Sequence, residues 1–390
     1  MSDSVIYKKV LFISENRPGS KSGSGVGGTV HYNIFKEIFG ETLHSVIVDG
    51  TSRECLGNDE FFRTPNAIMK AAAILNGNPP YLYPAVVKRL FCIIKNFRPE
   101  LLYFDNSVSG RIIRKIKKRF PKIRVICFFH DIESVLMREW MKSAGFLRRI
   151  SLKTMIKNEA VTVKFADKCI VLNEREKKLY EEVYGVSPDG VVPISIIKPQ
   201  ISVAEKRKHV PGAKLKLLFV GTFYKMNVDG LTWFVKNVLP ETDKVESLEV
   251  VGYNIEKFAD LWASDTRVKV YGTVDDLGAY YQAADVVIAP IFSGGGMKTK
   301  TCEALYYGKV FIGASESLVG YWENLENTDF CGKIVFKCNT ENEYFNALDK
   351  LYGQEFDIPD SSIAAWCDKY YSFESALNKY KAIIWDKKDI

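Results

Sequence analysis

The sequence lacks the features that mark several large classes of protein. No stretch approaches the ~18 consecutive apolar residues that a membrane-spanning helix needs, so we expect no transmembrane segment. Residues 1–4 lead almost directly into an apolar run, so we expect no signal peptide. The eight cysteines include no Cys-x-x-Cys pair, and Cys127 and Cys169 lie in apolar segments, as buried reduced thiols do. These absences argue against a disulfide framework or a zinc site and predict a cytoplasmic protein.

Acidic residues are scarce in the first half of the chain. Residues 1–200 contain 32 Lys and Arg against 20 Asp and Glu, whereas residues 201–390 contain 22 against 27. The halves therefore carry net charges of +12 and −5, which indicates two units with different partners. A chain of 390 residues is also too long for one typical core.

Short apolar runs alternate with amphipathic stretches throughout, and no tandem repeat or low-complexity tract interrupts them. This pattern is typical of parallel sheets with crossover helices, so we predict two successive doubly wound units joined in the polar segment 198–213. The clearest helices are predicted at 227–239, 277–284 and 298–307. The predicted strands are 9–14, 44–49, 101–104, 124–129, 168–172 and 190–193 in the first unit, and 215–220, 247–251, 268–271, 286–290, 310–313 and 333–336 in the second.

One stretch carries the clearest chemistry. Residues 294–296 are three glycines that follow an apolar strand and open a helix, which Gly308 ends. Glycines let a ligand approach the backbone, and a helix start offers unpaired N–H groups and a positive dipole end. Lys298 and Lys300 add positive charge where a structural helix would more often place an acid. Glu303, one turn after Lys300, is placed to bind a vicinal diol such as ribose. We predict a site for a diphosphate with a ribose attached; the alternative is an ordinary strand–turn–helix unit.

A second glycine-rich stretch matches a dinucleotide fingerprint. Residues 23–28 read Gly-Ser-Gly-Val-Gly-Gly, and Asp49 ends the next predicted strand. The fingerprint needs a tight turn, yet residues 15–22 separate the strand end from the first glycine. We therefore predict a long flexible loop over the cleft, ending at a helix that starts near Thr29, rather than a nicotinamide or flavin oxidoreductase.

His130 follows the apolar strand 125–129, at the end where such folds bind their ligands. There it could donate a hydrogen bond to substrate or accept a proton; the alternative is a histidine that only caps the turn. Asp131 and Glu133 are expected to cap the next helix, from Ser134 onward.

Asp275 and Asp276 precede the predicted helix 277–284. With no third acidic residue nearby, we expect them to cap that helix rather than to hold a metal ion. The sequence supports no metal site elsewhere.

A basic amphipathic helix is predicted within residues 111–124, which contain eight basic residues and no acid. Its apolar stripe consists of Ile112, Ile113, Ile116 and Phe120, and a second basic run covers 138–157. Such a pattern favours docking on anionic lipid, the alternative being plain solvated surface. No recognition motif or stacking platform accompanies the runs, so we expect no nucleic-acid partner.

Together these segments resemble the retaining glycosyltransferases of the GT-B fold, in the large group around glycosyltransferase family 4. The resemblance covers nearly the whole chain and is strongest from 215 to 314. The segments that carry it are 27–28, 130–133, 219–222, 227–230, 233–234, 271–276, 283–286, Pro290 and 294–303.

The resemblance implies an α/β architecture of two doubly wound Rossmann-like domains facing across a cleft. Residues 1–200 would bind the acceptor and residues 201–390 the donor, with the last helix a candidate to pack back on the first domain. It implies a hexosyltransferase-type enzyme that moves a sugar from a nucleotide-diphosphate donor to a glycan or lipid-linked acceptor with retention, without a metal ion or cofactor. The pathway would be surface polysaccharide synthesis (lipopolysaccharide O-antigen, capsule or exopolysaccharide) at the inner face of the plasma membrane.

The resemblance also assigns residue roles. His130 would be the catalytic residue beside the donor sugar, Glu303 would take the ribose hydroxyls, and Lys298 and Lys300 would take the diphosphate together with backbone N–H groups of the glycine-led turn. The backbone of 271–276 would receive the base. The other residues expected to contact the donor are Gly27, Gly28, Thr222, Lys225, Asn227, Gly272, Val274, Gly294, Gly295, Gly296, Met297 and Thr301.

Two departures from the family pattern keep alternatives open. The first of two family glutamates separated by seven residues is Gly295 here, which leaves the contact to the donor sugar unassigned. The usual Arg and Lys of an earlier loop are Thr222 and Asn227, with Lys225 as a substitute. The alternatives are a nucleotide-sugar epimerase of the same fold, a catalytically inactive glycosyltransferase-like partner subunit and, from another class, a nucleic-acid binder.

Overall fold

The computed structural model describes residues 7–19, 23–49, 54–196 and 206–385. The contacts divide the chain into unit 1, Met1–Pro193 with Ala376–Ile390, and unit 2, Ile194–Ser375. The predicted join at 198–213 falls partly on residues 197–205, which lie outside the described residues. In the described parts, no helix combines the length and apolar character that spanning a membrane requires.

In the described residues, unit 1 holds an eight-stranded sheet with the order β3-β4-β2-β1-β5-β6-β7-β8, parallel except for the β3–β4 pair. Every residue of β1 is buried, as expected for a parallel strand that helices cover on both faces. The strands are β1 Val10–Ser14, β2 Leu43–Ile47, β3 Glu54–Leu56, β4 Asp59–Phe61, β5 Leu101–Phe104, β6 Arg124–Phe129, β7 Lys168–Val171 and β8 Gly190–Val191.

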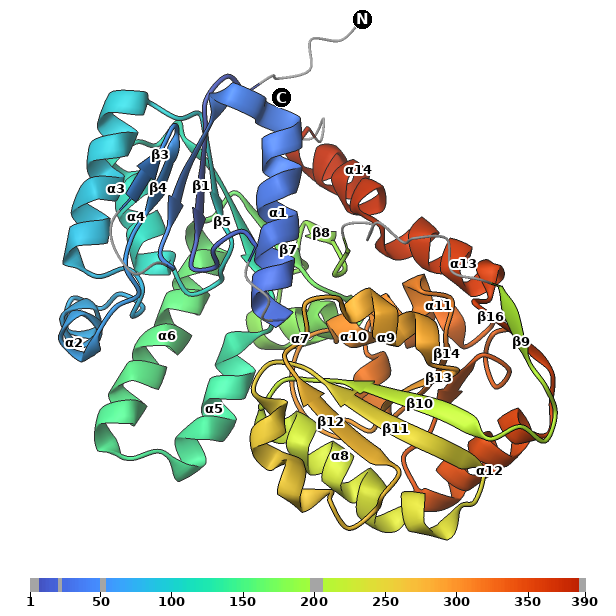
Figure 1. The fold of residues 1–390 in the computed structure, drawn as a ribbon. Coiled ribbons are helices and arrows are strands. Elements are labelled where there is room, and N and C mark those ends of the chain that lie inside the picture. The colour runs from blue at the N-terminus through green and yellow to red at the C-terminus, as the bar shows by residue number, and fades with distance from the viewer. Residues whose placement is uncertain (1–6, 20–22, 50–53, 197–205, 386–390) are drawn as a thin grey trace, which may run out of the picture. The chain divides into compact units, whose positions relative to one another are not determined.

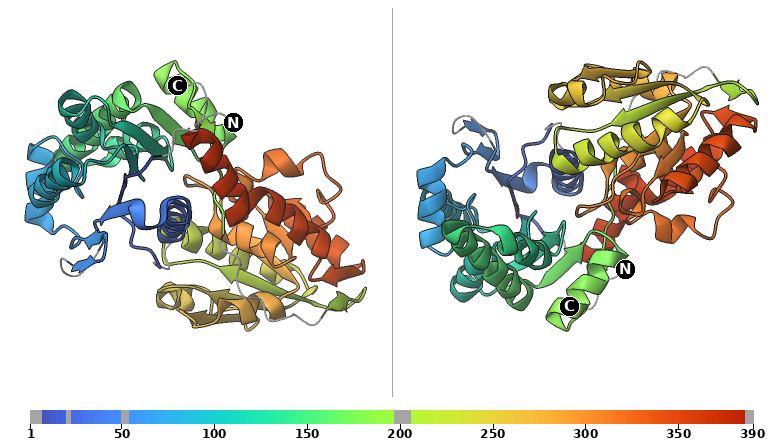
Figure 2. Two further views of the ribbon diagram at one scale, coloured as in Figure 1. Left: turned by 90° about the horizontal axis from the view of Figure 1, so that it is seen from above. Right: turned by 90° about the horizontal axis from the view of Figure 1, so that it is seen from below.

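Helices lie on both faces of the unit 1 sheet (Figures 1 and 2). The predicted basic amphipathic helix exists as α4, whose Ile112, Ile113 and Ile116 are fully buried. Helix α14 joins this unit by a 2.8 Å hydrogen bond between the hydroxyls of Tyr380 and Tyr103. The helices are α1 Gly23–Phe39, α2 Ala67–Leu75, α3 Pro84–Phe97, α4 Gly110–Arg119, α5 Glu133–Ser143, α6 Phe146–Phe165, α7 Glu174–Tyr184 and α14 Phe373–Ile384.

Unit 2 holds, in its described part, a parallel six-stranded sheet with the order β12-β11-β10-β13-β14-β15 and a separate antiparallel pair, β16–β9. The α/β class with two mainly parallel sheets is therefore confirmed. The strands are β9 Arg207–His209, β10 Leu215–Val220, β11 Val245–Val251, β12 Val268–Gly272, β13 Val286–Ala289, β14 Val310–Gly313, β15 Val335–Lys337 and β16 Phe356–Ile358. The α-helices are α8 Lys225–Asn237, α9 Leu277–Ala283, α10 Thr299–Tyr306, α11 Trp322–Leu325, α12 Glu341–Tyr352 and α13 Ser361–Tyr371.

The loop predicted over residues 23–28 is wrong, because α1 begins at Gly23 rather than near Thr29. Gly27 and Gly28 therefore belong to the helix. A Cβ atom on Gly28 would lie 2.6 Å from the Cβ of Asn16, so the glycine allows α1 to pack against the chain that leaves β1. Residues 20–22 lie outside the described residues.

Helix α8 packs so tightly that one of its positions admits no side chain. A Cβ atom on Gly230 would collide with the carbonyl oxygen of Pro290, which follows β13. Propensity alone makes Gly→Ala in a helix stabilising by about 0.5–1 kcal/mol, so the contact and the propensity predict opposite signs.

We expect Gly230→Ala to destabilise the protein by about 1–3 kcal/mol, because the backbone must move to admit the methyl group. The melting temperature should fall by roughly 3–10 °C in thermal denaturation. Gly27→Ala is the matched control, since a Cβ there meets nothing within 4 Å and should leave the melting temperature unchanged or raise it. An equal response of the two variants would contradict the packing argument.

Candidate functional site

The glycine-led turn of unit 2 connects β13 to α10, as predicted. Gly294 and Gly296 have positive φ values of 131° and 62°, which L-residues with side chains rarely adopt. Among the described residues, the backbone N–H groups of Gly295, Gly296 and Met297 have no hydrogen-bond partner. Lys298 is the N-cap residue of α10 and makes no side-chain cap. The turn and the helix start therefore present several free N–H donors together, as an anion site requires.

Lys298 folds back over this turn. Its Nζ donates to the carbonyl oxygens of Gly295 and Gly296 at 2.9 and 3.2 Å and lies 3.2 Å from Oε1 of Glu316. Its side chain is 10% exposed. The ammonium group is thus held beside the free N–H groups and not in bulk water.

Lys300 is buried and points toward helix α8. Its Nζ donates to Oδ1 of Asn227 at 2.7 Å and lies 4.4 Å from the centroid of the Phe219 ring. Burial, with the nearby Lys298 charge, lowers the pKa of Lys300 to about 7, although Glu303 opposes the shift. An amide oxygen and an aromatic face do not neutralise a buried ammonium group, so this position favours an incoming anion.

Glu303 lies one turn further along α10. Its Oε2 accepts a 2.8 Å hydrogen bond from the Tyr281 hydroxyl. Burial raises the pKa of Glu303, against the hydrogen bond from Tyr281 and the charge of Lys300. The other oxygen, Oε1, makes no hydrogen bond to any of the described residues, which leaves acceptor capacity for a ligand hydroxyl.

Two of the residues predicted to contact the donor, Lys225 and Asn227, lie at the start of α8, and Asn227 contacts Lys300 of α10. Asn227 donates from Nδ2 to the carbonyl oxygen of Thr222 at 3.0 Å while its Oδ1 holds Lys300, so the structure brings these three together. Lys225 is exposed and pairs with Asp229 on the surface of the same helix. Lys225 therefore does not join the cluster around Lys300.

Of the remaining predicted residues of unit 2, Gly272 and Val274 lie at the end of β12 and in the loop after it, and Thr301 lies in α10. Gly272 ends β12 with φ +69°, and its carbonyl oxygen accepts from the N–H of Gly252 at 2.7 Å. Val274 is half-buried in the following loop. Thr301 is buried and donates its hydroxyl hydrogen to the carbonyl oxygen of Ser317, which gives it a structural role within α10.

The cap predicted for α9 is present. Asp276 is the N-cap residue, and its side chain accepts from the N–H of Gly278 at 2.9 Å. Asp276 thus stabilises the start of α9, as expected.

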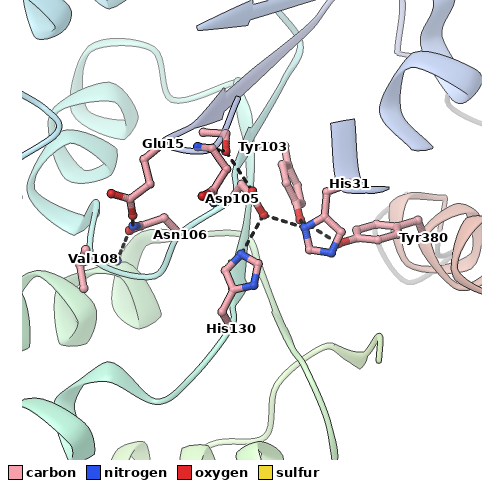
Figure 3. A network of polar contacts seen from close by, with 10 residues as sticks. Glu15, His31, Tyr103, Asp105, Asn106, Val108, His130 and Tyr380 are labelled. Carbon is pink, nitrogen blue, oxygen red and sulfur yellow. Dashed lines mark hydrogen bonds and ion pairs between the residues drawn. The ribbon is translucent and has the colours of Figure 1, made fainter. Parts of the chain in front are cut away.

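In unit 1, His130 belongs to a polar cluster centred on Asp105 (Figure 3). Oδ1 of Asp105 lies 3.1 Å from Nε2 of His130 and 2.7 Å from Nδ1 of His31, and Oδ2 accepts from the Ser14 hydroxyl at 3.0 Å. These groups come from the carboxyl ends of β1, β5 and β6 and from α1. Asp105 is 1% exposed.

The pKa values in this cluster move in different directions. Burial disfavours the charge on Asp105, but His31 and His130 outweigh it, so the pKa of Asp105 is lowered. Burial lowers the pKa of His31 despite the neighbouring carboxylate. For His130, burial is outweighed by the charge of and hydrogen bond to Asp105, which raise its pKa.

The predicted capping of α5 by Asp131 and Glu133 is wrong. The N–H groups of Glu133 and Ser134 donate to the two carboxylate oxygens of Glu159, at 3.0 and 2.7 Å. The N–H of Ile132 donates to Glu176 at 2.9 Å. Carboxylates from α6 and α7 thus take the place of a local cap, and burial, followed by the Asp131 and Glu159 charges, raises the pKa of Glu133 to about 8.

Sequence reasoning missed His31 and Asp105. Asp105 follows the predicted strand 101–104, so the rule that selected His130 applies to it equally. His31, Asp105 and His130 are also, within the described residues, a set whose ligand atoms lie within 4.8 Å of one another, as in a metal site. The sequence indicated no metal site, because these three residues lie far apart along the chain.

Comparison with known proteins finds a family match over part of the chain. Residues 214–354 match the model of a family described as glycosyl transferases group 1. An uncharacterised glycosyltransferase of Methanocaldococcus jannaschii is 23% identical to the chain over 301 residues, which are 72% of each protein.

Solved structures match over nearly the full length. Sucrose-phosphate synthase from Thermosynechococcus elongatus has a TM-score of 0.70 at 14% identity, over 96% of this chain and 98% of that one. The Anabaena protein HepE, solved in complex with UDP-glucose, has a TM-score of 0.62 at 11% identity, over 98% and 100%. At such identities, the likeness establishes the fold alone.

The position of Lys300 predicts a pH dependence of stability. Between its folded pKa of about 7 and its ordinary value, the unfolded chain binds a proton that the folded chain does not, so stability rises with pH. From pH 7 to 9 this gain is about 2 kcal/mol. Lys300→Met should remove this gain in stability. The measurement is the difference in the free energy of unfolding between wild type and Lys300→Met at each pH.

Lys236→Met, on the exposed end of α8, is the matched control and should keep the wild-type slope. A difference between wild type and Lys300→Met that stays flat from pH 7 to 9 would show that Lys300 is not desolvated.

Proposed function

We propose that the chain is a group 1 glycosyltransferase, as the match over residues 214–354 and the GT-B fold support. In this proposal it moves a hexosyl group from a nucleotide-diphosphate sugar to a glycan or lipid-linked acceptor with retention. One observation carries the proposal. One turn and one helix of unit 2 bring four kinds of group together: the free backbone N–H groups of the glycine-led turn, Lys298, the partly neutral Lys300 and Glu303. This is the donor set that a diphosphate joined to a ribose needs.

The diphosphate is the part of the donor that these groups fit best. When the bond between the anomeric carbon and the diphosphate oxygen breaks, negative charge grows on the leaving group. The free N–H groups and the two lysines are pre-placed to stabilise that charge. Lys300 takes up a proton as the anion arrives, since a nearby negative charge raises its lowered pKa. Positive charge from the protein makes the proposed reaction independent of metal.

The ribose and base have places further along unit 2. Glu303 accepts from the ribose hydroxyls while Tyr281 holds its other oxygen. β12 lies three positions from β13 in the sheet, roughly 14 Å at the usual strand spacing, so a nucleoside diphosphate can extend from α10 toward Gly272 and Val274. Because HepE was solved with UDP-glucose, a UDP-hexose is the first donor to test.

His130 is the proposed catalytic residue on the acceptor side, in unit 1. The new bond forms between the acceptor oxygen and the anomeric carbon on the face that the diphosphate leaves, and the acceptor proton departs with the diphosphate. His130 binds a hydroxyl of the reacting sugar and orients it. Gly27 and Gly28, in the first turns of α1, add backbone contacts at most, since they form part of a helix.

The surface of unit 1 supports an acceptor carried by a membrane. Helices α5 and α6 lie side by side and meet at the α5–α6 tip, residues 140–150 (Figure 1). The first turn of α6 contains Arg148 and Arg149 and no acidic residue, although acids are favoured there. Four apolar side chains of the tip are between 42% and 80% exposed: Trp140, Phe146, Leu147 and Ile150.

Exposed aromatic and aliphatic groups beside arginines fit the interface of an anionic bilayer, where the rings enter the headgroup layer and the guanidinium groups meet phosphates. On the basic face of α4, Lys115, Lys118 and Arg119 are exposed, whereas Lys117 is held by Asp167 at 2.8 Å. We place the reaction at the inner face of the plasma membrane, in the synthesis of a surface polysaccharide such as lipopolysaccharide, capsule or exopolysaccharide.

For donor binding, we expect UDP-hexoses to raise the melting temperature of the wild-type protein. Glu303→Ala should weaken donor binding about 10–100-fold, because two charged hydrogen bonds are lost. His130→Ala should lower kcat about 100-fold or more while the donor Kd changes little. Glu246→Ala, an exposed carboxylate of β11, is the control and should change neither. Calorimetry gives Kd, and release of nucleotide diphosphate gives kcat.

Each alternative has its own outcome in this experiment. Unchanged turnover in His130→Ala would remove the catalytic assignment. Conversion of the free donor without an acceptor would identify an epimerase. A protein that no nucleotide sugar stabilises would be the inactive partner subunit.

For membrane docking, we expect the protein to co-sediment with vesicles containing anionic phosphatidylglycerol and less with neutral phosphatidylcholine vesicles. Leu147→Ser should reduce the bound fraction severalfold, because the exposed leucine no longer enters the interface. Leu56→Ser, an exposed leucine of β3, is the matched control and should bind as wild type does. Equal loss in both variants, or binding that ignores lipid charge, would refute the role of the tip.

A further inference from the structure

Asp105 controls how the His130 ring is presented. A buried carboxylate that accepts from two imidazoles and a hydroxyl fixes both rings by charge-assisted hydrogen bonds. Because Nε2 of His130 is engaged by Asp105, Nδ1 is the nitrogen left for a ligand (Figure 3). The His130 side chain is 32% exposed, whereas Asp105 and His31 are buried, so the free nitrogen belongs to the one accessible ring of the cluster.

The charges around His130 favour its protonated form. The groups that act on it are Asp105, His31, Glu15, Asp131 and Glu133, of which only His31 is basic. His31 is buried, which lowers its pKa, and its Nδ1 lies 2.7 Å from Oδ1 of Asp105. The opposite pKa shifts of the two imidazoles therefore favour the positive charge on His130, the accessible ring, over His31.

We propose that Asp105 and His31 are positioning residues, which lock His130 with Nε2–H on Asp105 and with Nδ1–H free to donate to a substrate hydroxyl. The inference rests on the proposed function in one respect, that His130 contacts substrate. It decides between the two roles that the sequence left open for His130: the ring donates a hydrogen bond and does not take a proton.

The competing interpretation is a metal ion held by His31, Asp105 and His130. A tetrahedral zinc ion bound at about 2.0–2.1 Å separates its ligand atoms by roughly 3.3 Å. The 2.7 Å between Nδ1 of His31 and Oδ1 of Asp105 is shorter and has the length of a charge-assisted hydrogen bond. Oδ2 of Asp105 is also taken by Ser14, as in a hydrogen-bonded network.

The test is an NMR titration of the His130 ring in the full-length protein, with the nitrogen shifts reporting tautomer and protonation. In wild type, we expect Nε2 to stay protonated and the midpoint to lie above the ordinary histidine value. Asp105→Asn should lower the midpoint by about one pH unit or more, since the carboxylate charge is lost. Asp59→Asn, a carboxylate of the same unit bonded to Tyr32 and Ser45, is the control and should leave it unchanged.

Assays of sugar transfer at different pH values test the same inference on activity. Because protonated His130 is the active form, activity should fall as pH rises through its midpoint, and in Asp105→Asn this fall should move to lower pH. A carboxylate that only stabilised the fold would lower the melting temperature without moving the profile. The NMR titration measures the protein without substrate, so its result holds even where no transfer activity is found. A failure of this inference can therefore be distinguished from a failure of the proposed function.

Two results would overturn the inference. One is a His130 midpoint that does not move in Asp105→Asn. The other is stoichiometric zinc in the purified protein whose removal by a chelator changes the His130 shifts. Should Asp105→Asn fail to fold, His31→Gln takes its place. It frees Asp105 from one of its two imidazoles, so the His130 midpoint should rise, and a midpoint that stays or falls counts against the inference.

Discussion

The burial of parallel strands on both faces is the constraint on which both candidate sites depend. β1 and β13 have no appreciably exposed residue. Along such strands, every backbone N–H and C=O pairs with a neighbouring strand, and the side chains must be apolar or satisfied. Polar chemistry is therefore confined to the strand ends. Asp105 and His130 stand at the ends of β5 and β6, and the glycine-led turn follows β13, so one rule of sheet construction positions the groups in each unit.

Two buried ionisable groups show how differently such positions are satisfied. Asp105 receives hydrogen bonds from two imidazoles and a hydroxyl, and its pKa is lowered in spite of burial. Lys300 has only an amide oxygen and an aromatic face, and its pKa is lowered to about 7. A position that only packed α10 against α8 would be better served by Leu or Met, because a half-satisfied buried charge is costly. Lys300 is therefore the strongest structural support for the proposed anionic ligand.

The sequence predicted the elements whose signals are local. Strands 101–104, 124–129, 215–220 and 310–313 have the predicted bounds, because continuous apolar runs flanked by polar turns define buried parallel strands. The pairs β3–β4 and β9–β16 were missed, since strands of only three residues that include charged side chains carry no periodic pattern.

The sequence also missed partners that are distant along the chain. Glu159, in α6, accepts hydrogen bonds from the start of α5, and His31 and Asp105 surround His130. The helical start of α1 was missed for the opposite reason, because glycines that are read as loop also permit close helix packing, as Gly28 does beside Asn16.

In unit 2, the departure from the family pattern at Gly295 affects the sugar side of the site and not the phosphate side. Lys298 still bonds to the carbonyl oxygens of this turn, and Glu316, from the 3-10 turn Ser315–Leu318, supplies a carboxylate beside it. The turn therefore keeps a paired lysine and free N–H groups without an acid at 295. What the glycine removes is a side chain, and with it one proposed means of selecting among sugars, while the groups proposed to bind phosphate are unchanged.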